Sequence, residues 1–575
     1  MKKLFKYLRP YRLSISLIVL FIFLQCLCNL YLPTLMAKIV DNGVIKGDIP
    51  YIWRIGGFML AVSICAVVLS ISAGFLSSRT SSSFGRVLRS EVFAHAEQFT
   101  LHEFDHFGTS SLITRSTNDI TQVQQLVNMM LRMMIMAPLN FIGGILMAVY
   151  TDARLSLVIV VMVPLLAIAI FAIFSRATVL FKSLQVKIDK LNRVLRENLT
   201  GIRVIRSFNR VDFEKRRFDD ANLDLTSTTT RVQKIMATLM PLLMLIINFS
   251  TLAIIWFAGI RINNGLMQVG SLIAFIQYVM QLLFSIMMVS MMFFMIPRAS
   301  ASAARINEVL EKVPEIADRE LVRHANGAPG TIEFRNVTFS YPGAEKPAVS
   351  NISFVARPGQ VTALIGGTGS GKSTLVSLIP RFYDIDSGAL LVDGIDVREQ
   401  SQENLRSKIG YVPQKAILFT GTIADNIRYG KDDATDEEIK HAADIAQATG
   451  FIAEMQNGFD SFIEQGGTNV SGGQKQRLSI ARVLVRRPEI YIFDDSFSAL
   501  DFKTDAKLRS ALKEEVSNST VLIVAQRVST VRDADVIIVL DEGRIAGIGK
   551  HRELLETCQV YREIVSSQLS EEESA

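Results

Sequence analysis

The chain of 575 residues has few cysteines and only a small excess of one charge sign. It contains four cysteines, Cys26, Cys28, Cys65 and Cys558, and their spacing matches neither a metal-binding motif nor a disulfide framework. The formal net charge is +6, and many basic residues flank apolar segments, where they orient helices relative to a membrane. We therefore expect no cysteine-based metal site, no disulfide scaffold and no nucleic-acid partner.

The sequence also lacks an even distribution of apolar residues, because they are concentrated before about position 300. A helix needs about 20 mostly apolar residues to cross the hydrocarbon core of a bilayer. A chain of this length also exceeds one compact core. The sequence therefore predicts an all-α transmembrane domain of six helices over residues 1–312, followed by a soluble domain. The six apolar segments are residues 13–36, 52–76, 130–150, 155–174, 237–260 and 271–296.

Basic residues distinguish the two sides of the predicted membrane domain. Segments 79–128 and 176–236 are rich in Arg and Lys, whereas the links near 41–50, 151–154 and 261–270 are short and contain few. Because Arg and Lys accumulate in cytoplasmic loops, both termini are expected to lie in the cytoplasm. The two long basic segments have helical patterns, so we expect the membrane helices to extend well beyond the bilayer.

Residues 1–12 combine basic and apolar side chains, a composition typical of a short helix in the membrane interface. A secretory signal peptide begins in a similar way, but its apolar stretch is shorter and ends at a cleavage site with small residues. Here the apolar stretch is longer, and five further candidate spans follow it. We therefore expect residues 13–36 to be a membrane span.

The soluble domain is expected over residues 331–575, after a linker at 313–330. In it, a short apolar strand at 361–365 precedes a glycine-rich loop that matches the phosphate-binding pattern. Glycine allows backbone N–H groups to surround phosphate oxygens, Lys372 reaches the β- and γ-phosphates, and Ser373 ligates Mg²⁺. The loop consists of Gly366, Gly367, Thr368, Gly369, Ser370, Gly371, Lys372, Ser373 and Thr374.

A second apolar strand, at residues 490–493, ends in Asp494. A carboxylate at this position can hold Mg²⁺ through water, opposite the phosphate loop. The phosphate loop and the aspartate at the end of a strand together predict an α/β nucleotide-hydrolase fold that binds a nucleotide with Mg²⁺.

Between these two elements lies Val-Ser-Gly-Gly-Gln-Lys-Gln-Arg at 470–477, and with this segment the chain closely resembles the ATP-binding cassette (ABC) family. Six spans followed by one α/β P-loop cassette is the layout of an exporter half-transporter, so the resemblance covers the whole chain. It implies that ATP binds between two cassettes. It also implies roles for further residues: Ser471, Gly472, Gly473 and Gln474 cap the γ-phosphate on the opposite cassette, Tyr341 stacks on adenine, Gln414 senses the γ-phosphate and ligates Mg²⁺, and Asp501 lies in the dimer-contact loop.

The resemblance also implies two segments that transmit cassette closure to the membrane helices. Residues 104–119 resemble the exporter segment that forms a coupling helix, and a second such contact is expected around 203–217. The overlapping stretch 102–106 matches the HExxH pattern of zinc proteases as well. No third metal ligand is evident downstream in the sequence, so we expect the coupling role.

Two catalytic positions depart from the ABC family pattern. The family usually has Glu after the strand-terminal aspartate, as general base, and a later His that contacts the γ-phosphate, whereas this chain has Asp495 and Gln526. The Asp495 side chain is one methylene shorter than Glu, and Gln526 donates a hydrogen bond but carries no charge. Because loss of a positioned base typically costs about 10²–10⁴ in rate, we expect reduced hydrolysis at this chain's own site.

Two kinds of dimer are compatible with these replacements. In a heterodimer, a different half-transporter supplies Glu and His at its own site, which the intact segment 471–474 of this chain completes. In a homodimer, Asp495 acts as a slow base at both sites. The replacements affect only the nucleotide on this chain's own phosphate loop. This asymmetry favours the heterodimer, and it predicts an altered signature segment in the partner.

The predicted function is that of the degenerate-site subunit of a heterodimeric bacterial ABC exporter of the multidrug type, in the cell membrane. Its expected partners are a second half-transporter, membrane lipid and a hydrophobic or amphipathic small molecule. A methionine-rich last span, with Met280, Met287 and Met288, suits either helix packing or an adaptable apolar cavity. The alternative is a homodimeric exporter of lipids or lipid-linked compounds. A non-transporting regulator would need additional regulatory segments, and none is visible in the sequence.

Overall fold

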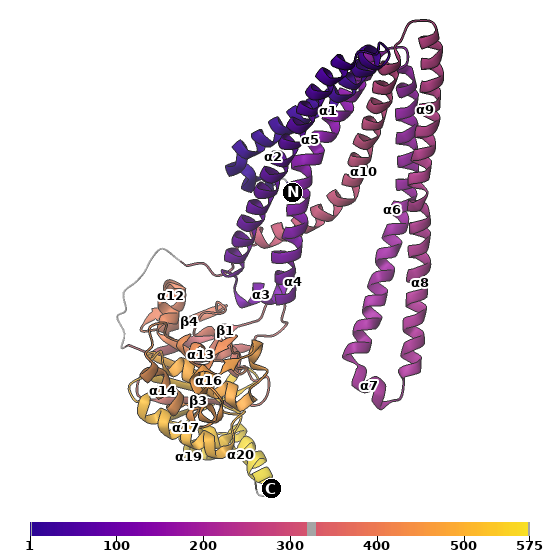
Figure 1. Ribbon diagram of the computed structural model, residues 1–575. Coiled ribbons are helices and arrows are strands. Elements are labelled where there is room, and N and C mark those ends of the chain that lie inside the picture. Colours follow the sequence, from indigo (N-terminus) through magenta and orange to yellow (C-terminus); the bar gives the residue numbers. More distant parts are fainter. Residues whose placement is uncertain (2, 319–328, 573–575) are drawn as a thin grey trace. The chain divides into compact units, whose positions relative to one another are not determined.

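The computed structural model describes residue Met1, residues 3–318 and residues 329–572 (Figure 1). The predicted linker at 313–330 falls partly outside the described residues, because 319–328 are not among them. The chain divides into two compact units. The first consists of Met1–Glu97 and Ser110–Lys312, and the second of Gln98–Thr109 and Val313–Ala575.

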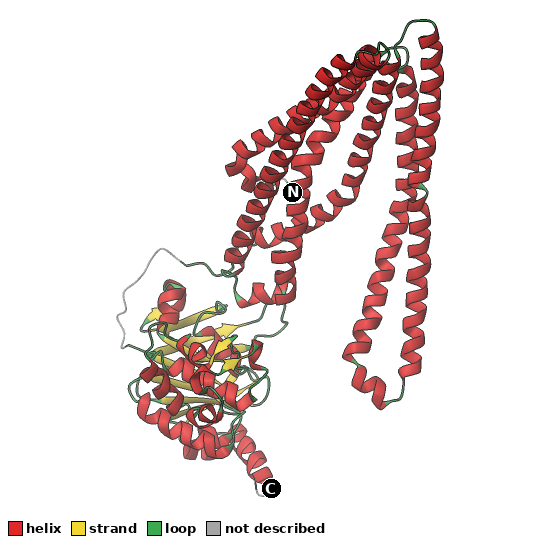
Figure 2. Cartoon of the chain, viewed as in Figure 1, coloured by secondary structure: helices red, strands yellow, loops and turns green. Residues whose placement is uncertain are grey.

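The first unit is helical throughout its described elements (Figure 2). Among the described residues, six helical stretches are long and apolar enough to cross a membrane, which confirms the predicted number of spans. The elements are η1 (Leu4–Tyr11), α1 (Arg12–Lys38), η2 (Ile39–Val44), α2 (Ile49–Ala96), α4 (Thr109–Thr114), η3 (Arg115–Asp119), α5 (Ile120–Thr151), α6 (Leu157–Thr200), α7 (Ile202–Ser207), α8 (Val211–Ala237), α9 (Leu239–Asn263) and α10 (Val269–Glu311).

The long helices extend beyond the apolar segments that predict them. Helix α2 is 48 residues long, although the apolar segment in it ends near residue 76. Its N-cap is Asp48, whose side chain accepts a 3.0 Å hydrogen bond from the backbone N–H of Tyr51. Inside the bilayer, a helix must form all of its backbone hydrogen bonds within itself. Outside the bilayer the helix can continue with polar residues, because water can bond to its exposed groups.

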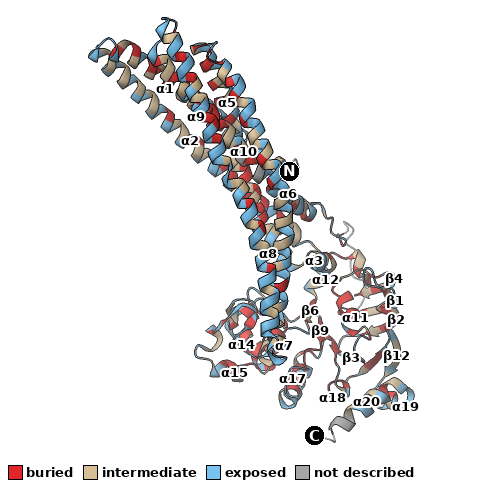
Figure 3. Cartoon of the chain, turned by 90° about the vertical axis from the view of Figure 1, so that its right-hand side faces the viewer, coloured by how far each residue is buried: buried red, intermediate tan, exposed pale blue. Residues whose placement is uncertain are grey.

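Two groups of helices make up the first unit. Helices α1, α2, α5 and α10 run side by side, and α6 packs along α8 and α9 (Figure 1). Exposed residues lie along the long helices (Figure 3). Large apolar side chains are among them, including Trp53, Phe75 and Phe171, which are 79%, 63% and 75% exposed. Exposed apolar surface of this extent is typical of contact with lipid.

The second unit is an α/β structure whose largest sheet has the strand order β12-β11-β3-β10-β9-β6 in the described residues. In this sheet β11, β3, β10, β9 and β6 run parallel, and β12 is antiparallel to β11. Every residue of β9 and β10 is buried, as expected for parallel strands that are covered on both faces. The strands are β3 (Val361–Gly366), β6 (Ile409–Val412), β9 (Ile490–Asp494), β10 (Thr520–Val524), β11 (Val536–Asp541) and β12 (Arg544–Gly549).

Smaller sheets and helices surround this central sheet. An antiparallel sheet has the order β2-β1-β4-β5, and β7 pairs with β8. These strands are β1 (Ile332–Phe339), β2 (Val349–Ala356), β4 (Ser387–Val392), β5 (Ile395–Asp396), β7 (Gly421–Thr422) and β8 (Phe462–Ile463). The helices are α3 (Leu101–Phe107), α11 (Lys372–Leu378), η4 (Val397–Glu399), α12 (Gln402–Ser407), α13 (Ile423–Arg428), α14 (Asp436–Ile445), α15 (Thr449–Glu454), η5 (Gly458–Asp460), η6 (Gln465–Gly467), α16 (Gly472–Leu484), α17 (Phe502–Glu515), α18 (Val528–Val531), α19 (His551–Thr557) and α20 (Gln559–Glu572).

The parallel strands position the candidate site. The carboxyl ends of β3, β9, β10 and β6 meet at one edge of the sheet, because neighbouring strands run in the same direction. Ligands of open α/β sheets bind at this edge. The predicted fold class, an all-α membrane domain followed by an α/β P-loop domain, is confirmed.

Candidate nucleotide-binding site

The glycine-rich loop at residues 366–374 connects β3 to α11 at the carboxyl edge of the sheet. Gly369 and Gly371 have φ values of +82° and +93°, in the left-handed region that favours glycine. A Cβ atom on Gly371 would lie 2.7 Å from the carbonyl oxygen of Ala348, so a larger residue does not fit there. The loop backbone therefore has the close curvature that phosphate binding by N–H groups requires.

The Lys372 side chain points back into this loop. Its Nζ donates hydrogen bonds to the carbonyl oxygens of Gly366, at 2.8 Å, and Gly367, at 2.7 Å. Burial lowers the pKa of the Lys372 ammonium group, whereas the nearby carboxylates of Asp495 and Asp494 raise it. Phosphate oxygens would give this buried cation charge-matched partners, so the loop fits a nucleotide phosphate.

Ser373, near the end of the loop, contacts Asp494 at the end of β9. The Oδ1 atom of Asp494 accepts a 2.9 Å hydrogen bond from the Ser373 hydroxyl, and its Oδ2 atom accepts a 3.1 Å bond from the Tyr411 hydroxyl. Burial raises the pKa of Asp494 despite these two donors. A serine hydroxyl and a carboxylate are oxygen ligands suited to Mg²⁺, so the chemistry of this donor pair fits that ion.

Asp495 is held between two glutamine side chains. Its Oδ2 atom accepts hydrogen bonds from Gln414 Nε2 at 3.1 Å and from Gln526 Nε2 at 3.0 Å. Its backbone has φ +48°, and its N–H donates to the carbonyl oxygen of Val524 at 3.0 Å, which fixes the residue beside β10. Burial raises the pKa of the Asp495 carboxyl, and the bonds from Gln414 and Ser498 lower it. The two departures from the family pattern, Asp495 and Gln526, are thus in direct contact.

Most of these residues line one cavity of about 390 Å³, whereas Asp494 and Tyr411 are not among its lining residues. Its lining includes Tyr341, Thr368, Gly369, Gly371, Lys372, Ser373, Thr374, Gln414, Asp495 and Gln526. The Tyr341 hydroxyl forms a 3.1 Å hydrogen bond with the Thr374 hydroxyl, and its ring packs edge-on against Tyr383 with centroids 5.4 Å apart. Because Tyr341 is 38% exposed, part of its ring is accessible to a ligand.

The signature segment, residues 471–474, lies elsewhere in this unit. Ser471 caps α16: its hydroxyl accepts from the N–H of Gln474 at 3.3 Å, and the Gln474 side chain accepts from the N–H of Ser471 at 2.8 Å. Asp501 caps α17 by accepting from the N–H of Thr504 at 2.9 Å. Neither the signature segment nor Asp501 lines the cavity, and both Ser471 and Asp501 are exposed.

Sequence reasoning missed two residues that organise the site. Tyr411 lies on β6 beside β9, and its hydroxyl donates a hydrogen bond to Asp494. In the sequence, only its position two residues before Pro413 indicated that it lies near the site. Gln568 on α20 donates from Nε2 to the carbonyl oxygen of Gln526 at 2.6 Å and accepts from the N–H of Val528 at 2.7 Å. It therefore holds the backbone on both sides of Arg527, and a glutamine in a polar helix carries no sequence signal for such a contact.

The HExxH stretch forms part of α3. Thr100 caps this helix, and the Glu103 side chain accepts from the N–H of Thr100 at 2.9 Å and from the N–H of Glu315 at 3.0 Å. His102 Nδ1 lies 2.9 Å from a carboxylate oxygen of Glu315. Glu103 thus connects segment 98–109 to the segment that follows α10. Within the described residues, no group of three metal-ligating side chains is present.

The predicted coupling segment at 104–119 is interrupted. Helix α3 ends at Gly108, which has φ +72°, and α4 and the π-helical turn η3 follow it. The second predicted region, 203–217, covers most of α7 and the start of α8, at the turn between two long helices (Figure 1).

A phosphate loop, a strand-end aspartate pair and six spanning helices on one chain define a membrane transporter driven by ATP. Family comparison agrees, because residues 15–287 match the ABC transporter transmembrane region and residues 349–498 match the ABC transporter cassette. An uncharacterised ABC transporter ATP-binding protein of Mycobacterium tuberculosis is 45% identical over 98% of this chain and 97% of its own length. The chain belongs to the ABC transporter family.

Two further similarities narrow the class. An ATP-dependent lipid A-core flippase of Desulfotalea psychrophila is 31% identical over 99% of both chains. The solved structure of a bacterial Atm1-family ABC exporter with ATP bound superposes with a TM-score of 0.80, at 26% identity over 97% of this chain and 98% of that one. The protein is therefore a multi-pass bacterial membrane protein, an ATP-binding and ATP-hydrolysing half-transporter of the exporter type that works as a dimer.

Proposed function

We propose that this chain is the degenerate-site subunit of a heterodimeric bacterial ABC exporter. The observation that carries the proposal is the contact of Asp495 with both Gln414 and Gln526, at 3.1 Å and 3.0 Å. A general base must reach the attacking water, and the carboxylate of Asp495 is both one methylene short and occupied by two amide donors. ATP would remain bound at this site longer than at a site with Glu and His.

The remaining residues of the site suit nucleotide binding. Lys372 and the loop N–H groups would bind the phosphates, and Tyr341 would stack on adenine. Ser373, Asp494 and Gln414 would hold Mg²⁺, which when bound neutralises phosphate charge. The 2.9 Å contact between Ser373 and Asp494 supports this assignment. Gln414 would also sense the γ-phosphate, because it lines the same cavity as Lys372 and donates a hydrogen bond to Asp495.

The signature segment of this chain would complete the site of the partner. Residues 471–474 are intact in sequence and lie away from the cavity that contains Asp495. A partner with Glu and His at its own catalytic positions would thus hydrolyse ATP against Ser471, Gly472, Gly473 and Gln474 of this chain. Asp501 would lie in the contact between the two cassettes.

The proposed substrates are hydrophobic or amphipathic compounds, including drugs. The apolar, methionine-rich α10 supports this class, because flexible thioethers adapt to varied ligands. The likeness to a lipid A-core flippase supports a second candidate, export of lipids or lipid-linked compounds by a homodimer. In either case we propose a membrane domain over residues 1–312 and a cassette over 331–575, with both termini in the cytoplasm.

Purification of this chain from its native membrane, identification of any different half-transporter bound to it, and ATPase assays of the pair test the proposal. We expect the pair to hydrolyse ATP, and replacement of the partner's catalytic Glu by Gln to abolish this activity. We expect this chain alone to bind ATP but to hydrolyse it slowly. Full-speed hydrolysis by this chain alone, unaffected by the partner's substitution, would favour the homodimer instead.

A further inference from the structure

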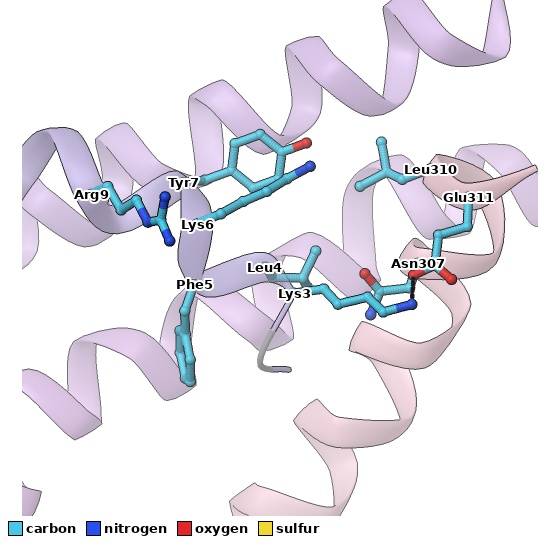
Figure 4. A pocket seen from close by; sticks show the side chains of 9 residues that line it. All are labelled: Lys3, Leu4, Phe5, Lys6, Tyr7, Arg9, Asn307, Leu310 and Glu311. Atoms are coloured by element: carbon cyan, nitrogen blue, oxygen red, sulfur yellow. Dashed lines mark hydrogen bonds and ion pairs between the residues drawn. The ribbon is translucent and has the colours of Figure 1, made fainter.

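A cavity of about 520 Å³ lies between η1 and the end of α10, within the first unit (Figure 4). Its lining consists of Lys3, of residues 4–7 and Arg9 from η1, and of Asn307, Leu310 and Glu311 from α10. The cavity therefore joins two segments that are far apart in sequence, and it is separate from the nucleotide site.

Helix η1 packs against α1 and α2, and an ion pair joins the residue before it to α10. Leu4 is buried, with 1% exposure, and the Lys3 ammonium group forms a 2.7 Å ion pair with the Glu311 carboxylate (Figure 4). The buried Leu4 side chain thus anchors η1 in the first unit, and the ion pair links the start of the chain to the end of α10.

The cavity carries an excess of positive charge. Lys3 is neutralised by Glu311, whereas Lys6 and Arg9 are exposed and have no acidic partner within the described part of the chain. The Lys6 Nζ lies 4.8 Å from the centre of the Tyr7 ring, which directs it along the cavity wall (Figure 4). The lining thus offers two unpaired cations from η1 and the amide of Asn307 from α10, groups that suit a phosphate.

The position of the cavity points to phosphate from the membrane. Helix η1 ends at Tyr11, and α1, the first spanning helix, begins at the next residue. The distribution of Arg and Lys assigns this end of α1 to the cytoplasmic side, so η1 lies at the level of the inner lipid headgroups. Leu4, Phe5 and Leu310 add an apolar part to the lining, which a free phosphate ion would not use.

We propose that this cavity binds the headgroup of an anionic phospholipid from the cytoplasmic leaflet. Lys6 and Arg9 contact the lipid phosphate, Asn307 donates a hydrogen bond to it, and the apolar residues contact the glycerol backbone and the upper acyl chain. Because Glu311 ends the helix that leads into the second unit along the chain, a bound lipid would sit beside the point where the membrane domain ends.

The test measures phosphatidylglycerol bound to the full-length chain in detergent, by native mass spectrometry over a lipid titration, with phosphatidylcholine as the neutral comparison. The variant Lys6→Gln/Arg9→Gln removes both unpaired cations of the cavity. The control Arg176→Gln/Lys182→Gln removes two exposed cations from α6, in the second basic cytoplasmic segment. Each cation near a membrane surface contributes roughly fivefold in affinity, so the cavity variant should weaken phosphatidylglycerol binding roughly 20-fold or more.

The expected result is preferential binding of phosphatidylglycerol that the cavity variant loses and the control retains. Asn307→Phe, which fills the cavity without changing charge, should lose it as well. Equal losses in the cavity variant and the control, or unchanged binding in Asn307→Phe, would show general surface attraction and overturn the proposal. Displacement of the lipid by an equal concentration of soluble glycerol phosphate would also overturn it, in favour of a free phosphate site.

Discussion

The carboxylate of Asp495 accepts a 3.0 Å hydrogen bond from the side-chain amide of Gln526, the second residue after the neighbouring strand β10. Asp495 follows β9 and Gln526 follows β10, and these strands are paired in parallel. The two positions at which this chain departs from the family pattern therefore form one contact. A substitution at either position is expected to change the hydrogen bonding and the orientation of the side chain at the other.

Restoring both positions should restore hydrolysis at this site. The variant Asp495→Glu/Gln526→His lengthens the base by one methylene and removes the amide donor that holds Asp495. Hydrolysis at this site is expected to rise, towards the factor of about 10²–10⁴ that a positioned base contributes. The measurement is the ATPase rate of the transporter pair in which the partner's own Glu is replaced by Gln. Asp495→Asn serves as the control, and an unchanged rate in the double variant would contradict the assignment.

Removing the Gln568 side chain should loosen the segment that carries Gln526. Gln568 bonds the backbone at Gln526 and Val528, at 2.6 Å and 2.7 Å, so Gln568→Leu frees both groups. Each hydrogen bond contributes about 0.5–1.5 kcal/mol, so the fold should persist while ATP retention at this site shortens. The release rate of a fluorescent ATP analogue measures this effect.

Gln559→Leu is the matched control for Gln568→Leu. Gln559 is exposed on the same helix and bonds only to Glu563, at 2.9 Å, among the contacts in the described residues. Its replacement should leave the release rate unchanged. If both variants changed nucleotide release equally, α20 would be acting through its overall stability and Gln568 would not be a positioning residue.

Near its C-terminal end, α10 forms an ion pair with η3, the turn that precedes α5. Arg305 Nε donates to Asp119 Oδ2 at 2.7 Å, and the Asp119 side chain is buried while that of Arg305 is 45% exposed. Arg305→Ala leaves this carboxylate without its cation, and after allowing for water access we expect a loss of about 1–2 kcal/mol. Thermal unfolding in detergent measures it. Arg217→Ala, which breaks an exposed pair with Glu197, should cost less, and an equal cost would contradict the account.

The C-terminal helices should weaken at mildly acidic pH. Burial lowers the pKa of His551, whose ring lies 2.7 Å from the Tyr561 hydroxyl. In the unfolded chain His551 regains its ordinary pKa and binds a proton more readily, so stability falls as the pH drops through that ordinary value. Thermal unfolding from about pH 7.5 to about pH 5.5 measures this loss. His551→Gln should flatten the dependence, whereas His441→Gln, at an exposed position on α14, should leave it intact.

The sequence predicts those parts of the molecule that depend on local pattern. Apolar length predicts the six spans, and residues 366–374 with Asp494 predict the site at the sheet edge. Helix α3 is separated from α4 at Gly108. A single glycine in the sequence does not predict that a helix ends there. The contact of Gln568 with the segment after β10 joins residues 42 positions apart, so it arises only from tertiary packing.

The most direct test of the account measures ATP hydrolysis by the reconstituted transporter pair with one of two substitutions in this chain. Asp495→Asn alters this chain's own site, whereas Ser471→Arg blocks the signature segment that we assign to the partner's site. We predict that Asp495→Asn leaves most of the ATPase activity and that Ser471→Arg abolishes it. Loss of activity in Asp495→Asn would contradict the account, because this chain's own site would then be the one that drives the transporter.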